Sequence, residues 1–414
     1  MRRALAIACL CALSLAPASA AVEQSVGTLL HGGSYIIQRD TASPVTAIAL
    51  WFRAPAAGYD SATPGLSRIA AAAAASAPLA SGPSLAHFVR NLGGRFSINV
   101  FPDLVGIDAL VPNSQARRVI AAMTAAYFSP RIDSASIKDA DEDAAVARLT
   151  QSYSVADTLQ SAIATTLFAQ GPYHVGVLPP SSRTVRAIPL GAVRGYAQQA
   201  FRSTNAVLAI VGGVTSDVLL AVTDGDVASP GDSPLDSLVD PIQHSVTINT
   251  AVPGVGLGWG GPPISDERAA TAMDFLANIL FSSGPRGLQG QFVTLHSAGM
   301  FFATAIGTDP TPISNDFLQR VKALAVPMDP ATFAKRHTAF LFRLRDQMQY
   351  PDEVADELGW YMSEGNGPYA PGDARANYWQ AVISLTPAYV ASIAAKYLAT
   401  PVIVTAHHVP GTAP

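Results

Sequence analysis

The chain has 414 residues, 49% of them hydrophobic, and a formal net charge of −4 at pH 7. An acidic balance argues against nucleic acids and anionic membrane surfaces as partners. Beyond residue 20, no apolar run reaches the roughly 18 residues that indicate a transmembrane helix. The hydrophobic content is enough for a sizeable core, and the length suggests roughly two or three domains.

The first twenty residues have the pattern of a secretory signal peptide. It consists of a positive start at residues 2–3, an apolar run to about Leu15 and the small residues Ala18-Ser19-Ala20 as a cleavage site. We therefore expect export to the periplasm or secretion. Both cysteines, Cys9 and Cys11, lie in this segment. The mature chain is thus expected to form no disulfide and no cysteine-based site.

The first half of the chain is predicted to combine short strands and helices. Turn residues before a helix-forming run predict a helix from Pro64 to Ala77, and Gly93-Gly94 ends a second one. Alternating apolar runs predict strands. The predicted strands cover residues 25–30, 34–39, 45–53, 96–101, 104–111 and 206–213, and the helices cover 64–77, 84–93, 114–127, 134–151, 155–168, 189–201 and a short stretch from 216.

The second half repeats this order more compactly. Its predicted strands cover residues 245–250, 255–261, 299–307 and 401–409, and its helices cover 265–281, 286–295, 314–324, 330–347, 351–362 and 387–398. Between the halves, the segment from Asp224 to Pro241 is rich in Pro, Ser, Gly and Asp and has no periodicity, which is typical of a linker.

The repeated order predicts an α+β fold of two homologous domains, each an antiparallel-rich sheet packed against helices. The predicted division is a signal peptide at 1–20, an N-terminal domain at 21–225, a linker at 226–241 and a C-terminal domain at 242–414. The stretch Gly254–Gly258 lacks the spacing and the lysine of a phosphate-binding loop. It is therefore interpreted as a glycine-rich strand or a bulge.

Six blocks, in this order and at this spacing, carry a family resemblance. They are a strand ending in WFRAPAAGYD, then TPGLSRI (63–69), LAHFVRNLGGRFSINVFPDLVGIDALVP (85–112), AAMTAAYFSPRI, GPYHVGVLPPSSRTVRAIPLGAVRGYAQQAF (171–201) and RSTNAVLAIVGGV. With them, nearly the whole mature chain resembles the pitrilysin/insulinase family of zinc peptidases, in particular its mitochondrial-processing-peptidase-like branch. The resemblance implies that the two domains form half of a clam shell, closed by a second, similar chain.

The resemblance also locates the positions of a zinc site that this chain has lost. Active members carry H-x-x-E-H on the helix after a Gly-Leu pair and a glutamate ligand on a later helix. In the register set by Gly65-Leu66, these positions are Arg68, Ala71, Ala72 and, on the later helix, Leu149. These side chains cannot hold zinc, so the resemblance implies a non-catalytic chain without a cofactor. The alternative interpretation, an ordinary alanine-rich core helix, also implies no catalysis there.

Other candidate sites are weaker. The family's substrate-binding arginine and tyrosine fall on Leu295 and Phe302, so this pair is also expected to be lost. The eight histidines show no helical i, i+3 or i+4 pairing, and the vicinal pair His407-His408 on a strand would point to opposite faces. The acidic cluster at 139–143 is interpreted as a solvated helix face. We therefore predict no metal site.

These observations leave three functions open. The first is an exported, non-catalytic subunit of a heterodimeric peptidase, partnered by a catalytic zinc-peptidase chain of the same family. The others are a free-standing peptide-binding protein and a metallopeptidase with an unrecognised or partner-completed site, so whether the chain is an enzyme stays open. In the family, substrate adds as a strand to a sheet edge. The corresponding residues are Phe96, Ser97, Ile98 and Asn99, with an ordinary covered core strand as the alternative.

Overall fold

The computed structural model describes residues 23–30, 32–54, 63, 65–80, 82–152, 155–168, 172–175, 181–223, 245–282, 284–285, 287–364 and 373–408. The expected signal peptide and linker lie outside these residues. The expected limits of the two domains fall in the same undescribed stretches. Within the described parts, no helix is both long and apolar enough to span a membrane.

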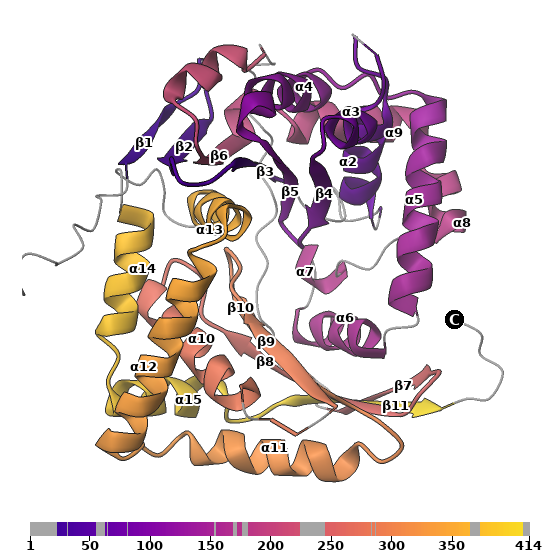
Figure 1. Ribbon diagram of the computed structural model, residues 1–414. Helices are drawn as coiled ribbons and strands as arrows, with labels where there is room; N and C mark the ends of the chain where they lie inside the picture. Colours follow the sequence, from indigo (N-terminus) through magenta and orange to yellow (C-terminus); the bar gives the residue numbers. More distant parts are fainter. Residues whose placement is uncertain are drawn as a thin grey trace, which may run out of the picture.

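The first half of the chain forms a six-stranded sheet in the order β1-β2-β6-β3-β5-β4 (Figure 1). Its strands are β1 (Glu23–Thr28), β2 (Ser34–Arg39), β3 (Val45–Arg53), β4 (Arg95–Val100), β5 (Leu104–Pro112) and β6 (Ala206–Gly212). All pairs are antiparallel except β2 with β6. The central strand β3 is buried along almost its whole length, because both faces of the sheet are covered.

Helices of the same half cover one face of this sheet. They are α2 (Leu66–Ser76), α3 (Leu85–Asn91), α4 (Ala116–Phe128), α5 (Ser134–Ser152), α8 (Ser182–Ala187) and α9 (Leu190–Ala200). The 3₁₀ helices η1 (Asn113–Gln115), η2 (Ser203–Asn205) and η3 (Ser216–Ala221) join them to the strands. Ile48, Leu50 and Phe52 of β3 point into this core and are essentially inaccessible to solvent. The alternation of side chains along β3 sends its other residues to the opposite face.

The second half forms a five-stranded sheet in the order β7-β11-β8-β10-β9. Its strands are β7 (Ser245–Thr250), β8 (Gly254–Gly261), β9 (Leu288–Val293), β10 (Gly299–Ile306) and β11 (Val402–His408), and only β7 with β11 is parallel. Its helices are α10 (Glu267–Phe281), α11 (Thr311–Ala323), α12 (Pro330–Gln347), α14 (Asp373–Ile383) and α15 (Pro387–Tyr397). The predicted α+β fold with two antiparallel-rich sheets is thus confirmed.

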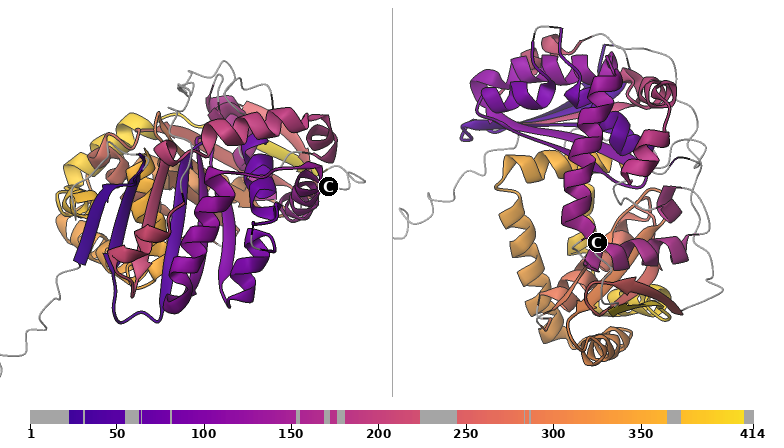
Figure 2. Two further views of the ribbon diagram at one scale, coloured as in Figure 1. Left: turned by 90° about the horizontal axis from the view of Figure 1, so that it is seen from above. Right: turned by 90° about the vertical axis from the view of Figure 1, so that its right-hand side faces the viewer.

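Each half lends one helix to the sheet of the other half. Helix α13 (Pro351–Glu364) of the second half packs on the first sheet, where Val354 and Leu358 are buried against Trp51. Helix α6 (Val155–Leu167) of the first half packs on the second sheet, where its Ile163 is buried against β10 and β11. Figure 2 shows both helices between the two sheets. This exchange, together with the short helix α7 (Pro172–Val175), joins the halves through apolar cores.

The glycine-rich stretch predicted as a strand is β8, and its glycines accommodate α6. A Cβ atom on Gly254, Gly256 or Gly258 would lie 3.0, 3.1 or 2.1 Å from a side-chain atom of α6. Residues spaced by two point to one face of a strand. The glycines therefore let the exchanged helix approach the sheet closely.

The predicted secondary structure differs from the observed one at several elements. The helix predicted over residues 286–295 is wrong, since Leu288–Val293 is strand β9. Gly287 has φ of 87° and Gly290 lies against the carbonyl of Phe302 on β10, so the backbone here favours pairing with β10 over a helix. The short helices α7 and α8 and helix α14 have no counterpart among the predicted helices.

Candidate functional site

Helix α2, to which the sequence resemblance assigns the positions of the zinc motif, begins after Gly65. This glycine has φ of 76°, in the left-handed region that glycine adopts most readily. Most of α2 is buried, including Ile69 and Ala71, and the Ala71 carbonyl accepts a 3.0 Å hydrogen bond from the Tyr127 hydroxyl. Small alanine side chains allow this close packing. Only one stripe of the helix faces outward from the core.

That stripe lines a cavity of about 630 Å³. Helices α2, α3 and α5 and strand β4 form its walls. Arg68 and Ala72 of α2, Phe96 and Ile98 of β4, and Asp143 and Ala144 of α5 are among the lining residues. The cavity therefore lies between α2 and β4, the strand predicted to bind peptides.

The residues at this cavity do not fit a zinc ion. Arg68 and Ala72 line it at the two histidine positions, whereas the methyl group of Ala71 lies in the core. Leu149 belongs to α5, but its side chain is outside the described residues. Of the described residues that line the cavity, Asp143 alone offers a carboxylate. Zinc needs several imidazole, carboxylate or thiolate ligands, and no group of three or more such side chains comes together in the described parts of the chain.

Strand β4 is an edge strand. Among the described strands it pairs only with β5. The Phe101 N–H donates to the Leu104 carbonyl at 2.8 Å and closes the hairpin. Hydrogen-bonded and non-hydrogen-bonded pairs alternate along an antiparallel ladder. With the observed register, the main-chain groups of Phe96, Ile98 and Val100 face away from β5, toward the open side.

Three of the four predicted peptide-binding residues line the cavity. Phe96 and Ile98 pack partly against the apolar core beneath it, whereas Ser97 borders the cavity although its side chain is on the opposite face of the strand. The exception is Asn99, whose side chain lies on the other face of the sheet and donates a 2.7 Å hydrogen bond to Asp108. This follows from the alternation of side chains along a strand. The interpretation of this segment as a covered core strand does not describe β4, because its side chains are only half buried or exposed up to Val100.

The other face of β4 and β5 meets α13 of the second half. Arg95 and Asp352 form an ion pair at 3.0 Å across the halves, beside a small cavity of about 310 Å³ that Asp108 also lines. Burial, reinforced by the negative charge of Asp356, raises the pKa of Asp108 to about 7. The Asn99 amide opposes this rise only in part. Sequence reasoning missed this acidic face because α13 belongs to the other domain.

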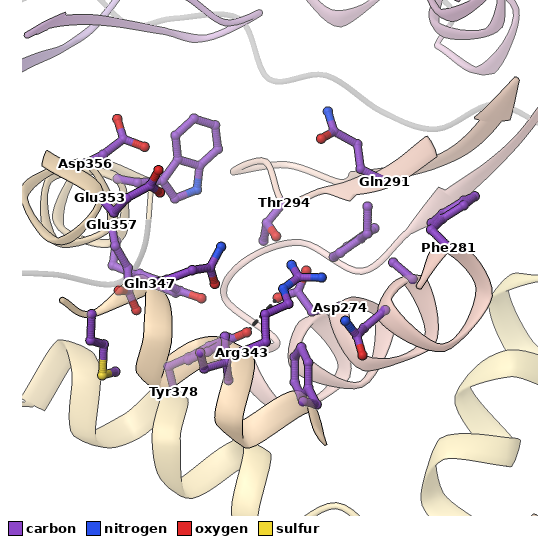
Figure 3. Close-up of a pocket in the computed structure, with 18 of the residues that line it drawn as sticks. Asp274, Phe281, Gln291, Thr294, Arg343, Gln347, Glu353, Asp356, Glu357 and Tyr378 are labelled. Atoms are coloured by element: carbon purple, nitrogen blue, oxygen red, sulfur yellow. Dashed lines mark hydrogen bonds between the residues drawn. The ribbon is translucent and has the colours of Figure 1, made fainter. Parts of the chain in front are cut away.

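A second large cavity, of about 360 Å³, lies in the C-terminal half (Figure 3). It is bounded by α10, β9, α12, α13 and α14, so, like the first cavity, it lies among several helices and one strand. On α10 its lining residues Asp274, Asn278 and Phe281 have the i, i+4, i+7 spacing of Arg68, Ala72 and Ala75 on α2. At this place on the helix the two cavities thus carry ionisable groups of opposite charge, an arginine in the first and an aspartate in the second.

The carboxyl group of Asp274 lines the second cavity and has a strongly shifted pKa. Burial raises its pKa to about 7, against the hydrogen bond from Tyr378 and the charge of Arg343. The Tyr378 hydroxyl lies 3.2 Å from Asp274 Oδ2, and Figure 3 shows Arg343 beside them. Glu353, Asp356 and Glu357 of α13 add negative charge on the opposite wall in the same view. No local pattern in the sequence marks this site.

A buried polar cluster joins the two halves near the end of α13. The Tyr173 hydroxyl donates to Asp103 and accepts a 3.1 Å hydrogen bond from the Ser297 N–H. Glu364 is 2% exposed, and burial, reinforced by the Asp103 carboxylate, raises its pKa well above the usual range. One oxygen each of Asp103 and Glu364 is buried without a partner among the described groups.

The other residues singled out in the sequence have structural surroundings. Leu295 and Phe302, at the positions of the family's arginine and tyrosine, are buried in the apolar cluster under α6. His174 Nδ1 lies 2.6 Å from the Phe168 carbonyl, and His408 Nδ1 lies 2.8 Å from the Ala251 carbonyl. These histidines hold loops and strand ends through hydrogen bonds to the main chain.

Three solved structures share this fold over nearly the whole chain. A protease from Helicobacter pylori has a TM-score of 0.79 and 14% identity, covering 94% of this chain and 100% of that one. A putative M16-like peptidase from Alicyclobacillus acidocaldarius has 0.78 and 12%, covering 94% and 99%. A peptidase M16 inactive domain from Pseudomonas fluorescens has 0.77 and 14%, covering 95% and 100%. No protein-family model matches the chain, and no curated protein matches it.

The chain therefore has the fold of the M16-like peptidases. This is the pitrilysin-type fold that the sequence resemblance implied. At 12–14% identity the likeness establishes architecture, and function has to be argued from the site.

Proposed function

We propose that this protein is an exported, non-catalytic homologue of M16-like peptidases that binds extended peptide segments along the open edge of β4. The observation that carries the proposal is the combination of an open strand edge with a cavity whose described lining offers no ligand set for zinc. Main-chain pairing with an edge strand depends little on side chains, so peptide binding survives the loss of metal ligands. The similarity to an M16 inactive domain from P. fluorescens agrees with such a role.

The proposed biological setting is a heterodimeric peptidase. This chain supplies the structural or substrate-binding half, and a related chain with an intact H-x-x-E-H motif supplies the zinc and the catalysis. The half-clam-shell layout and the exposed β4 edge support this, since an open edge in an exported protein invites aggregation unless a partner or substrate covers it. Co-purification of the untagged partner from the native host tests the setting. Recovery of the chain alone favours a free-standing peptide-binding protein.

The main experiment removes one outward-facing donor from β4. Ile98→Pro deletes an N–H on the open side of the strand and leaves the ladder to β5 intact. We expect binding of extended peptides, measured by fluorescence anisotropy, to weaken by roughly tenfold or more, the value of about one or two hydrogen bonds.

A matched control is available on the opposite edge of the same sheet. The Leu29 N–H donates to the Gly33 carbonyl, so Leu29 and Gly33 form a hydrogen-bonded pair. The main-chain groups of the preceding residue, Thr28 of β1, therefore point away from β2 toward the open side. Thr28→Pro should leave peptide binding unchanged. Equal binding by wild type, Ile98→Pro and Thr28→Pro would contradict the proposal, as would cleavage of peptides by the purified chain with one tightly bound zinc.

A further inference from the structure

The guanidinium group of Arg68 has no counter-charge in the described parts of the chain. Arg68 projects from α2 into the 630 Å³ cavity, and its side chain is half buried. Its Nε atom is fully buried and has no hydrogen-bond partner among the described residues. Burial lowers the pKa of this arginine, as expected for a cation that is partly removed from water.

Such an arrangement costs stability. A buried charge is usually paired, because removing it from water without a partner is strongly unfavourable. The aliphatic stem of an arginine can bury itself while its charged end reaches water, but here the first nitrogen of the guanidinium is already enclosed. An anion bound in the cavity would supply a counter-charge, and an acceptor, to the end of the guanidinium that lines the cavity.

The charges around Arg68 do not provide that acceptor internally. Two further arginines line the cavity, Arg90 and Arg95, against a single carboxylate among its described lining residues, Asp143. Arg95 is engaged with Asp352 of the second half at 3.0 Å, and Arg90 Nε donates to the Ala86 carbonyl at 3.2 Å. Asp143 is exposed on α5 and interacts electrostatically with Arg90. The described lining is therefore positive overall, with Arg68 as its unpaired cation.

The geometry of β4 directs a ligand to this cation. Phe96 and Ile98 both line the cavity and are on one face of β4. A strand added to the open edge continues the pleat, so every second side chain of it projects to the same face. Those side chains enter the cavity next to α2. The volume of 630 Å³ leaves room for a side chain and several waters at about 30 Å³ each.

We propose that Arg68 binds a carboxylate carried by the peptide on β4, as an acidic side chain or as the C-terminal carboxylate. This inference rests on the proposed peptide-binding function and adds to it a selectivity for peptides that carry a carboxylate. The arginine thus occupies the place of the family's first zinc ligand and holds an anion there instead of a metal. Planar guanidinium groups bind carboxylates through paired, charge-assisted hydrogen bonds.

The test compares nine-residue peptides of Ser, Thr and Val, acetylated and amidated, that differ only in a central Glu, Gln or Lys. With the full mature chain we expect the Glu peptide to bind roughly tenfold or more tightly than the Gln peptide, and the Lys peptide to bind most weakly. A fourth peptide has the central Gln and a free C-terminal carboxylate. Stronger binding of this peptide than of its amide identifies the chain end as a source of the carboxylate.

Two variants assign the effect to Arg68. Arg68→Gln should abolish the preference for carboxylates, while Arg68→Lys should keep part of it. The control Arg117→Gln changes an exposed arginine on α4 and should keep all of it. Arg68→Met should also raise the melting temperature of the free protein, because an unpaired charge is replaced by an apolar side chain of similar length.

The outcomes separate the two proposals. If wild type binds the Glu, Gln and free-carboxylate peptides equally, the carboxylate site is overturned while peptide binding stands. If the preference persists in Arg68→Gln, another residue carries it and the inference is wrong. If no peptide binds and Ile98→Pro changes nothing, the proposed function fails first and the inference fails with it.

Discussion

Gly359 of α13 lies directly on the indole ring of Trp51 of β3. A Cβ atom added at Gly359 would come within 2.2 Å of Trp51 Nε1. Trp51 is fully buried, and its ring also packs edge-on against Trp360 at a centroid distance of 5.6 Å. One glycine of the second half thus sets how closely the exchanged helix approaches the first sheet.

Gly359→Ala is therefore expected to destabilise the protein although it improves helix propensity. The added methyl group must push α13 from the sheet or move the indole, at a cost of about 1–3 kcal/mol. Thermal or urea unfolding measures this loss. The control is Gly195→Ala in α9, where nothing lies within 4 Å of the added atom and a gain of about 0.5–1 kcal/mol is expected. Equal effects of the two substitutions would contradict the close contact.

The corresponding contact in the other half predicts an energetic coupling. A Cβ on Gly258 of β8 would lie 2.1 Å from Ile163 Cγ2 of α6. Gly258→Ala should destabilise the fold, and so should Ile163→Ala by removing buried methyl groups. Because the second change removes the clashing atom, the double variant should be more stable than the sum of the single effects by about 1 kcal/mol or more. Additive effects would show that α6 does not rest on β8 as described.

The raised pKa of Asp274 predicts lower stability at higher pH. Its value of about 7 in the folded protein lies above the value near 4 of an unfolded chain. Between these limits the folded state holds a proton that the unfolded state has lost, so the free energy of unfolding falls as pH rises from about 4 to about 7. Asp274→Asn should therefore stabilise the protein at pH 8, by roughly 1–3 kcal/mol, and have little effect near pH 4.

Asp329 provides a control of opposite sign. It caps α12 by accepting hydrogen bonds from the Ala331 and Thr332 N–H groups, and the interactions with Thr332 lower its pKa. Asp329→Ala should destabilise the protein at neutral pH and less so once the carboxyl group is protonated in acid. Melting curves between pH 3 and 9 on both variants test the two signs together. Parallel profiles for both would rule out the buried carboxyl group as the cause.

Zinc binding should require several substitutions at once. Arg68→His alone offers one imidazole in a cavity whose described lining holds one carboxylate, Asp143. A catalytic zinc site needs three protein ligands, so we expect tight binding only when Arg68→His and Ala72→His are combined with Leu149→Glu. Ala71→Glu, which the full motif also needs, places a carboxyl group at a position now packed in the core, and it should lower the melting temperature. Calorimetric zinc titration of each variant checks this, and tight binding by Arg68→His alone would show that the register is wrong.

Interactions between near neighbours in the chain account for most of the local structure. Turn residues before an alanine run define α2, and alternating apolar residues define β3 and β5, because both patterns act within a few residues. The assignment of Arg68 and Ala72 to the zinc-ligand positions rests on the sequence resemblance and the register of Gly65-Leu66, and it stays a prediction. The local pattern predicts a helix where β9 lies, because this short, mixed run gains its structure from pairing with β10.

Contacts between distant segments determine which residues line the cavity at α2 and which residues join the two halves. The exchange of α6 and α13, the contact of Gly359 with Trp51 and the carboxyl pair of Asp103 and Glu364 connect residues that are far apart in the chain. Likewise, a helical pattern suffices to put Arg68 on a helix. That no described residue pairs with its charge becomes evident only when α2, β4 and α5 come together around it. Burial and the resulting loss of hydration depend on which elements meet in space, so these properties belong to the folded chain and not to any local pattern.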